Sequence, residues 1–219
     1  MCEADRPLPK EANGEELVRG RARMVTEDTT IGPGDWDDRD LDGEVFRRVH
    51  FVDLDLMELA DHGAVFEECS FGNVRFNVSV HENAAFVACS FRSCSFFDAS
   101  FTGCKLTGST FAGCTFGLLK ADGGDWSFTS LAGADLRGST FDGVRLREAD
   151  LSGANLEGAA LRRCDLTGAA LRQTDLTSCD LRGSDLSTLD PHAVTLRKAV
   201  VDPHQATVIV TALGLQVRP

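Results

Sequence analysis

Large apolar residues recur at every fifth position over most of this chain. From position 31 to position 201, 31 of the 35 residues in this phase are Ile, Trp, Leu, Phe or Val. Neither an α-helix nor a β-strand has a period of five, whereas a fixed period held over so long a stretch is typical of repeat architectures. The pattern therefore predicts that the chain between 31 and 201 is built from one repeated structural unit.

The positions around each large residue follow a pattern of their own. The residue two places before it is nearly always small from Ala64 onward, and Gly follows two places after it in 13 repeats, where it fits a turn with positive φ. Seven of the eight cysteines occupy the small position, namely Cys69, Cys89, Cys94, Cys104, Cys114, Cys164 and Cys179. Because no histidine accompanies them as a zinc ligand would, we expect these thiols to be inert core residues beside the large side chains.

The full motif is small, polar, large apolar, any residue and Gly, and it is clearest over 149–176, ADLSGANLEGAALRRCDLTGAALRQTDL. It resembles the A(D/N)LxG pattern of the pentapeptide repeat family. The resemblance implies an all-β fold, a right-handed quadrilateral parallel β-helix with one pentapeptide on each side and about 20 residues in each coil. It also implies that the large and small residues point inward and the other three point outward.

The two ends of the chain leave the repeat. Residues 1–30 are predicted to be an N-terminal extension or cap, and 202–219 to be a short α-helix followed by a short strand. In the second segment Asp202 suits the N-cap, Pro203 the first helical turn and Gly214 the C-terminal stop. The helix either only covers the last coil or also forms a dimer. For the dimer, the predicted interface consists of Ala206, Ile209, Val210, Leu213, Leu215 and Val217.

Four residues interrupt the phase of large residues: Asp61, His81, Ala121 and Pro191. The first three are spaced by multiples of 20, so they are expected to stack on one side of the solenoid. They are either tolerated imperfections or places where the chain bulges outward to form a contact surface. The residues of these predicted irregular loops are Asp61, His62, His81, Glu82, Lys120 and Asp122. Phe97, Leu118 and Phe128 fall in outward phases, and they are either covered by such bulges or exposed to a partner.

Charge and missing motifs restrict the function. The 34 acidic and 22 basic residues give a net charge of −12, which argues against direct nucleic-acid binding because phosphate neutralisation needs an excess of Lys and Arg. No apolar run approaches the roughly 20 residues of a membrane span and no signal peptide is evident, so we expect a cytoplasmic protein. The sequence shows no nucleophile motif, phosphate loop or histidine pair, so no enzyme activity, metal or cofactor is predicted.

A narrower resemblance concerns the C-terminal segment. A long pentapeptide rod followed by QAxxxxxALGLxV, here beginning at Gln205, is similar to the quinolone-resistance members of the family. This resemblance implies a homodimeric DNA mimic that binds DNA gyrase or topoisomerase IV and protects it from quinolone-like or other gyrase-directed antibiotics. The acidic surface facing gyrase would consist of Asp165, Asp175, Asp180, Asp185, Asp190 and Asp202. The alternative is a structural scaffold β-helix for another protein, and a continuous negative belt would favour the mimic.

Overall fold

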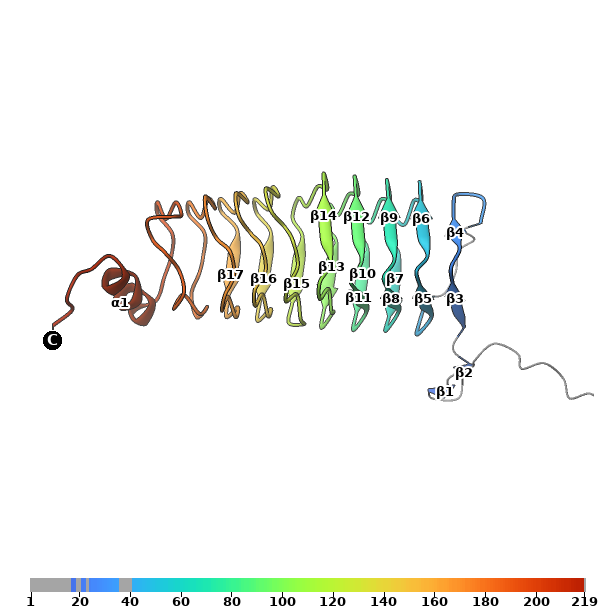
Figure 1. The fold of residues 1–219 in the computed structure, drawn as a ribbon, viewed down its shortest axis with the longest axis horizontal. Helices are drawn as coiled ribbons and strands as arrows, with labels where there is room; N and C mark the ends of the chain where they lie inside the picture. The colour runs from blue at the N-terminus through green and yellow to red at the C-terminus, as the bar shows by residue number, and fades with distance from the viewer. Residues whose placement is uncertain (1–16, 19–20, 23, 36–40, 219) are drawn as a thin grey trace, which may run out of the picture.

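The protein is a parallel β-solenoid in this computed structural model, which describes residues 17–18, 21–22, 24–35 and 41–218. The coils stack in chain order along one straight axis, and a helix follows the last coil (Figure 1). The strands of the solenoid pair in parallel with a register of twenty residues, as Phe46 does with Phe66 and Phe51 with Phe71. The predicted fold class is confirmed.

Three sides of the solenoid carry ladders of short strands. The β3 side consists of β3 (Val25–Glu27), β5 (Val45–Arg47), β8 (Val65–Glu67) and β11 (Ala85–Val87). The β4 side consists of β4 (Thr30–Ile31), β6 (His50–Val52), β9 (Ser70–Gly72), β12 (Ser90–Arg92) and β14 (Thr110–Ala112). The β7 side consists of β7 (Ala60–His62), β10 (Val80–Glu82), β13 (Ser100–Thr102), β15 (Lys120–Asp122), β16 (Thr140–Asp142) and β17 (Ala160–Arg162).

The fourth side, which we call the bridge side, is joined between coils by isolated bridges such as Asp55 with Arg75 and Asp135 with Asn155. Apart from the solenoid, β1 (Leu17–Val18) and β2 (Arg21–Ala22) form an antiparallel pair. The solenoid begins before the predicted boundary at 31, because β3 already pairs with β5. Most of the predicted extension, residues 1–16, 19–20 and 23, lies outside the described residues.

The core is a set of columns that run along the axis. The rings of Phe51, Phe71, Phe91 and Phe111 stack with 4.7 Å between successive centroids and interplanar angles of 5–7°, which matches the roughly 4.8 Å spacing of paired strands. Six of the seven described cysteines are buried beside such columns, as predicted, and Cys114 is half-buried. The period of five therefore places one large side chain and one small one inside each side of each coil.

The turn after each large residue also agrees with the sequence pattern. From Gly43 to Gly183 the residue two places after it has a positive φ, for example 64° at Gly103 and 68° at Gly138. The same conformation occurs at three large apolar residues, Val78 at 60°, Leu118 at 59° and Phe128 at 60°. These three positions therefore carry side chains that the turn itself disfavours.

The predicted bulges do not form. Asp61, His81 and Ala121 are buried and lie in β7, β10 and β15, in register with the neighbouring coils. Asp61 and His81 can stay inside because the imidazole Nδ1 hydrogen-bonds the carboxylate. Ala121 leaves room for the Trp126 indole, which meets Phe101 edge-on at 5.6 Å between ring centroids. Their predicted loop neighbours are exposed strand residues instead: His62, Glu82, Lys120 and Asp122.

The C-terminal helix α1 (Pro203–Ala212) closes the last coil. The Asp202 carboxylate accepts a hydrogen bond from the Gln205 backbone N–H, and the Gln205 Oε1 accepts one from the Asp202 backbone N–H. The Gln205 Nε2 also donates to the carbonyls of Leu181 and Ser184 at 2.6 and 2.8 Å. The short strand expected after the helix is not formed within the described chain, because residues 215–218 have no backbone partner for a ladder.

Candidate protein-binding surfaces

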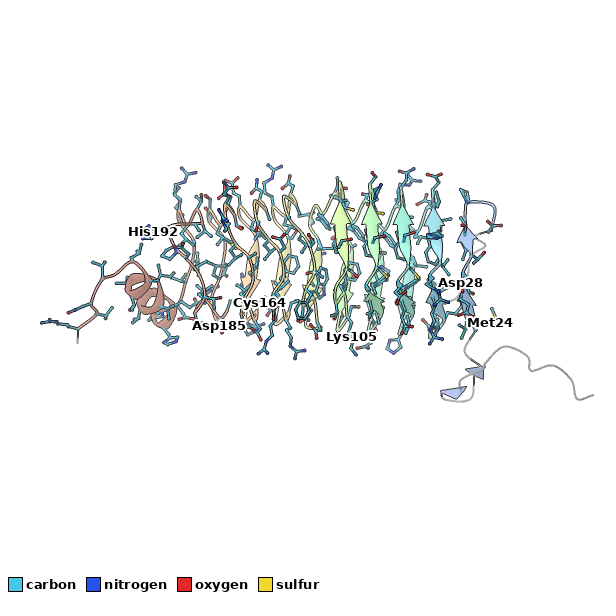
Figure 2. The ribbon with its side chains drawn as sticks, viewed as in Figure 1. Met24, Asp28, Lys105, Cys164, Asp185 and His192 are labelled. Carbon is cyan, nitrogen blue, oxygen red and sulfur yellow. The ribbon has the colours of Figure 1, made fainter. Side chains whose placement is uncertain are left out.

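The six aspartates predicted to face gyrase do not share one face of the rod. Their register places Asp165 and Asp185 in adjacent coils of the β3 side, Asp175 on the bridge side, Asp180 on the β7 side and Asp190 on the β4 side. The sixth, Asp202, caps the helix. Figure 2 shows Asp185 and His192 at opposite edges of the C-terminal part of the rod. The carboxylates thus form a belt around the last coils rather than a stripe.

Local donors hold these carboxylates in their charged form. The Thr177 hydroxyl and backbone lower the pKa of Asp175, and those of Ser187 lower the pKa of Asp185. Asp180 accepts from Arg182 and from Arg162, both at 2.7 Å, and the Arg182 contact holds the pKa of that carboxyl far below its usual range. All three aspartates are therefore ionised at neutral pH.

Arginines weaken the same belt. Beside the two that bind Asp180, Arg147 Nε lies 2.5 Å from the Asp165 carboxylate. Each such pair cancels most of its own field at a distance. The negative character of the belt therefore comes from Asp175, Asp185 and Asp190, which accept hydrogen bonds from neutral backbone N–H groups.

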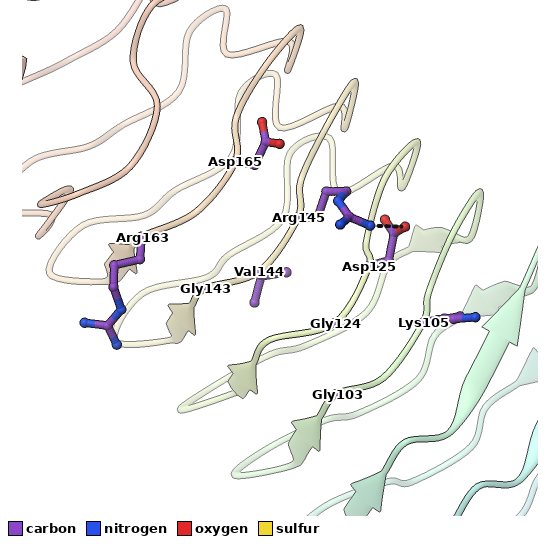
Figure 3. A pocket seen from close by; sticks show the side chains of 9 residues that line it. All are labelled: Gly103, Lys105, Gly124, Asp125, Gly143, Val144, Arg145, Arg163 and Asp165. Carbon is purple, nitrogen blue, oxygen red and sulfur yellow. Dashed lines mark hydrogen bonds and ion pairs between the residues drawn. The ribbon is translucent and has the colours of Figure 1, made fainter.

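A shallow groove of about 570 Å³ runs along the corner between the β7 and β3 sides (Figure 3). Glycines at 103, 124 and 143 make its floor, and Lys105, Arg145 and Arg163 supply cations at its rim. Arg145 is bound to Asp125 at 2.9 Å. Lys105 and Arg163 point away from each other in Figure 3. These cations do not converge on one point, so the groove lacks the arrangement of an anion site.

The predicted dimer residues fall into two groups. Ile209 packs against the core of the last coil, and Ala206 and Val210 are half-buried on the helix. Leu213, Leu215 and Val217 are exposed, by 41%, 59% and 54%. Of the six predicted dimer residues, Ile209 therefore contributes to the core, and three lie exposed after the end of the helix.

Other large apolar side chains are exposed far from the C-terminus. On the bridge side they include Met57, Val78, Phe97 and Leu118, and on the β3 side they include Phe128. The outward phases of Phe97, Leu118 and Phe128 were visible in the sequence, and no bulge covers them. Met57 and Val78 were missed. Met57 occupies the same position of the five-residue repeat as Phe97, and Val78 the same position as Leu118 and Phe128.

The buried group of Asp61, His81 and Ser79 is not a reaction centre. The Ser79 Oγ lies 3.0 Å from the imidazole Nε2, but the side chains of His81 and Asp61 are only 1% and 0% exposed. No substrate reaches them. Within the described ranges, no three His, Cys, Asp or Glu residues are grouped to hold a metal ion. Among the helices that the structure describes, none is long and apolar enough to cross a membrane.

Known proteins share the repeat and the fold. The family model described as Pentapeptide repeats matches in eight copies, over residues 82–116, 129–168 and 154–188. A trypsin-treated variant of QnrB1, a plasmid-mediated fluoroquinolone resistance protein, has 22% identity and a TM-score of 0.52, over 90% of this chain and 98% of that one. HetL, a pentapeptide repeat protein involved in heterocyst differentiation regulation in the cyanobacterium Nostoc, has 18% identity and a TM-score of 0.42, over 74% and 89%.

No curated protein sequence matches the chain. The likeness to QnrB1 shows the fold, since the identity is too low to carry a function. The family match agrees with the five-residue register of the sequence and with the twenty-residue pairing of the strands. The chain carries pentapeptide repeats over residues 82–116 and 129–188, and its fold is consistent with a pentapeptide repeat β-helix.

Proposed function

We propose that the chain is a cytoplasmic binding protein, and not an enzyme, that imitates the charge of duplex DNA and occupies the DNA-binding surface of DNA gyrase or topoisomerase IV. The observation that carries the proposal is a straight rod in a chain with a net charge of −12, with aspartates on all four sides of its C-terminal coils. By occupying that surface, the protein protects the enzyme from quinolone-like or other gyrase-directed antibiotics. The fluoroquinolone-resistance role of QnrB1 supports this choice of target.

The dimensions of the rod suit this role. Coils at about 4.8 Å make the stretch 31–201 roughly 40 Å long. This stretch holds 26 acidic and 16 basic residues, a net charge of −10. That corresponds to about one charge per 4 Å, against one per roughly 1.7 Å in duplex DNA. The imitation is therefore partial, and a dimer that joins two rods at their C-terminal ends would extend it to roughly 80 Å.

Binding to purified gyrase tests the proposal. We expect affinity to fall as salt rises, because the Debye length shortens to about 8 Å at physiological ionic strength, and we expect linear duplex DNA to compete. Replacing Asp175, Asp185 and Asp190 together by Asn should weaken binding more than the same change at three exposed acidic residues near the other end. The matched control residues are Asp35, Asp53 and Glu58. Binding that is absent, or that ignores both salt and DNA, would refute the mimicry.

The proposed dimer is tested separately. Leu215→Asp changes an exposed side chain outside the helix, so it should leave the melting temperature unchanged. If the C-terminal segment joins two rods, this variant should halve the mass in light scattering. An unchanged mass, or a wild-type chain that is monomeric at micromolar concentration, would contradict the dimer.

A second function, a scaffold for a protein other than gyrase, is favoured by one observation. The exposed apolar side chains of the bridge side lie far from the acidic belt, and a mimic of DNA has no use for them.

A further inference from the structure

Four apolar side chains stand in line on the bridge side. Met57, Val78, Phe97 and Leu118 belong to four successive coils and are exposed by 43%, 42%, 50% and 48%. Since coils repeat every twenty residues, their spacings of 21, 19 and 21 keep them within one position of a common column. We call these four residues the apolar ridge.

Two of these residues have a backbone conformation that their side chains disfavour. Val78 and Leu118 have φ near 60°, a conformation that favours Gly or Asn and disfavours branched side chains. Gly138 holds the equivalent position one coil after Leu118, with a φ of 68°. A side chain that strains the turn and exposes apolar surface indicates a binding role, because contiguous apolar patches on soluble proteins are rare.

The side chains lean along the axis and end at a depression. A Cβ added to Gly117 would lie 3.1 Å from the Phe97 ring, and one added to Gly138 would lie 3.6 Å from the Leu118 Cδ2. Both side chains therefore extend toward the next coil. Beside them lies a depression of about 270 Å³ lined by Cys114, Thr115, Phe116, Gly117, Asp135 and Arg137. The ridge and the depression together form a surface with a long apolar contact and a recess for one large side chain.

The spacing of the ridge suits an α-helix parallel to the rod. Coils repeat at about 4.8 Å and helical turns at about 5.4 Å, so one turn of such a helix meets each coil. Its apolar residues would recur at i, i+4, i+7 and i+11. An added β-strand would find no free edge, because backbone bonds such as Val78 N to Phe97 O already join these coils at 2.8 Å.

Acidic residues beside the apolar ridge indicate that the flanks of a bound helix would be basic. Glu58 follows Met57 directly, and Glu82 and Asp122 lie across the neighbouring corner on the β7 side. Within the part of the chain that the structure describes, Glu58 and Asp122 form no ion pair, and Glu82 meets only His62, at 3.5 Å. Lys or Arg on the partner would complement these carboxylates.

We propose that the apolar ridge is the docking site of an amphipathic α-helix of a partner protein, with basic residues on its flanks and one large apolar side chain in the depression. The helix lies parallel to the rod axis, across the coils that contain residues 57–118. This site is separate from the acidic belt, so the proposal does not rest on the function proposed above.

A synthetic helix tests the docking site on the full-length protein. The probe is a fluorescein-labelled 18-residue peptide with Leu at i, i+4, i+7 and i+11, Lys and Arg on the flanks and Ala elsewhere. We expect saturable binding in fluorescence anisotropy, and at least about tenfold weaker binding of a scrambled peptide of the same composition and of one with Glu in place of the basic residues. A probe that does not bind, or that binds no better than the scrambled peptide, would overturn the proposal.

Substitutions in the apolar ridge test whether the probe binds there. The triple change Val78→Asn, Phe97→Ser and Leu118→Gly removes the ridge and suits the two left-handed turns, so the melting temperature should be equal or higher while the affinity falls at least about tenfold. The matched control is Phe128→Asn on the β3 side, because Phe128 is 56% exposed with a φ of 60°. Unchanged affinity in the triple variant, or an equal loss in the control, would refute the site.

Two further measurements test where the probe binds and whether the natural ligand of the apolar ridge is a partner helix or a second copy of the chain. Bound probe should slow the reaction of Cys114 with a thiol reagent, followed by mass spectrometry, because Cys114 lines the depression. Unchanged reactivity at saturating probe would contradict the proposed placement. If the triple change dissociates a dimer instead, the occupant is a second copy of the chain and the partner helix is refuted.

Discussion

The buried pair of Asp61 and His81 allows a sharp test of how the core tolerates charge. The two residues occupy the same column in adjacent coils, and Asp61 Oδ1 has no hydrogen-bond partner among the described residues. Removing one partner leaves the other buried without its hydrogen bond, which costs about 3–5 kcal/mol in comparable pairs. Replacing both with apolar residues of similar size is neutral or stabilises by about 1–4 kcal/mol.

We therefore expect Asp61→Leu and His81→Phe to destabilise the protein individually and to compensate each other when combined. Phe suits position 81 because the imidazole already stacks on the Phe101 ring, with 4.7 Å between centroids. For a chain of this size, 1 kcal/mol shifts the melting temperature by about 2–4 °C. Each single change should lower it by about 6–20 °C, and the double variant should melt at or above the wild type.

The assay is a double-mutant cycle in urea and in thermal melts followed by circular dichroism. The same two strands supply the control, since His62 and Glu82 form an exposed pair at 3.5 Å one residue further on. Exposed pairs contribute at most about 1 kcal/mol, so that cycle should show little coupling. Additive losses in the Asp61–His81 cycle, with a double variant as unstable as the sum of the singles, would refute the reasoning.

Three further predictions follow from other parts of the rod. Gly124→Ala should cost more than about 3 kcal/mol in a denaturation titration, because the φ is 87° and an added Cβ would overlap the Cys104 carbonyl oxygen; a wild-type midpoint would contradict that geometry. Cys114, the half-buried member of the described cysteines, should react with iodoacetamide well before Cys104 under native conditions, and equal rates would argue against the buried register. Arg182 lowers the pKa of Asp180, so their interaction stabilises the fold above the unfolded pKa of about 3.9 and is lost as pH falls through the lowered pKa. Arg182→Gln should therefore reduce stability at pH 7 but not under strongly acidic conditions, and an equal loss at both extremes would refute the assignment.

The sequence predicted the repeat because a repeat depends on a local pattern that recurs many times. The coil length and the inward phases followed from the resemblance to the pentapeptide repeat family. The helix was equally accessible, since Asp202, Pro203 and Gly214 are strong local signals and α1 ends two residues before that glycine. The start of the solenoid was placed too late because Thr26, at the centre of β3, is not a large apolar residue.

The errors have a different origin, since they concern contacts between residues far apart in the sequence. Asp61 and His81 break the pattern when each is considered alone, and only their pairing twenty residues apart explains why both stay inside. Likewise Ala121 is explained by the indole of Trp126 and its contacts with the neighbouring coils. The dispersal of the six aspartates follows from the four sides of the coil. Arg147 and Arg162 pair with aspartates 18 residues further along the chain, so these ion pairs also depend on the stacking of the coils.

The four-sided coil has a consequence for how the molecule could change in length. Inserting or deleting twenty residues would move the apolar ridge nearer to or further from helix α1 and leave both facing the same way. Five residues would preserve every inward phase yet rotate all that follows by a quarter turn, as the twenty-residue pairing of four five-residue sides requires. The distance between two surfaces and their relative direction can thus be altered independently, without any change of core residues.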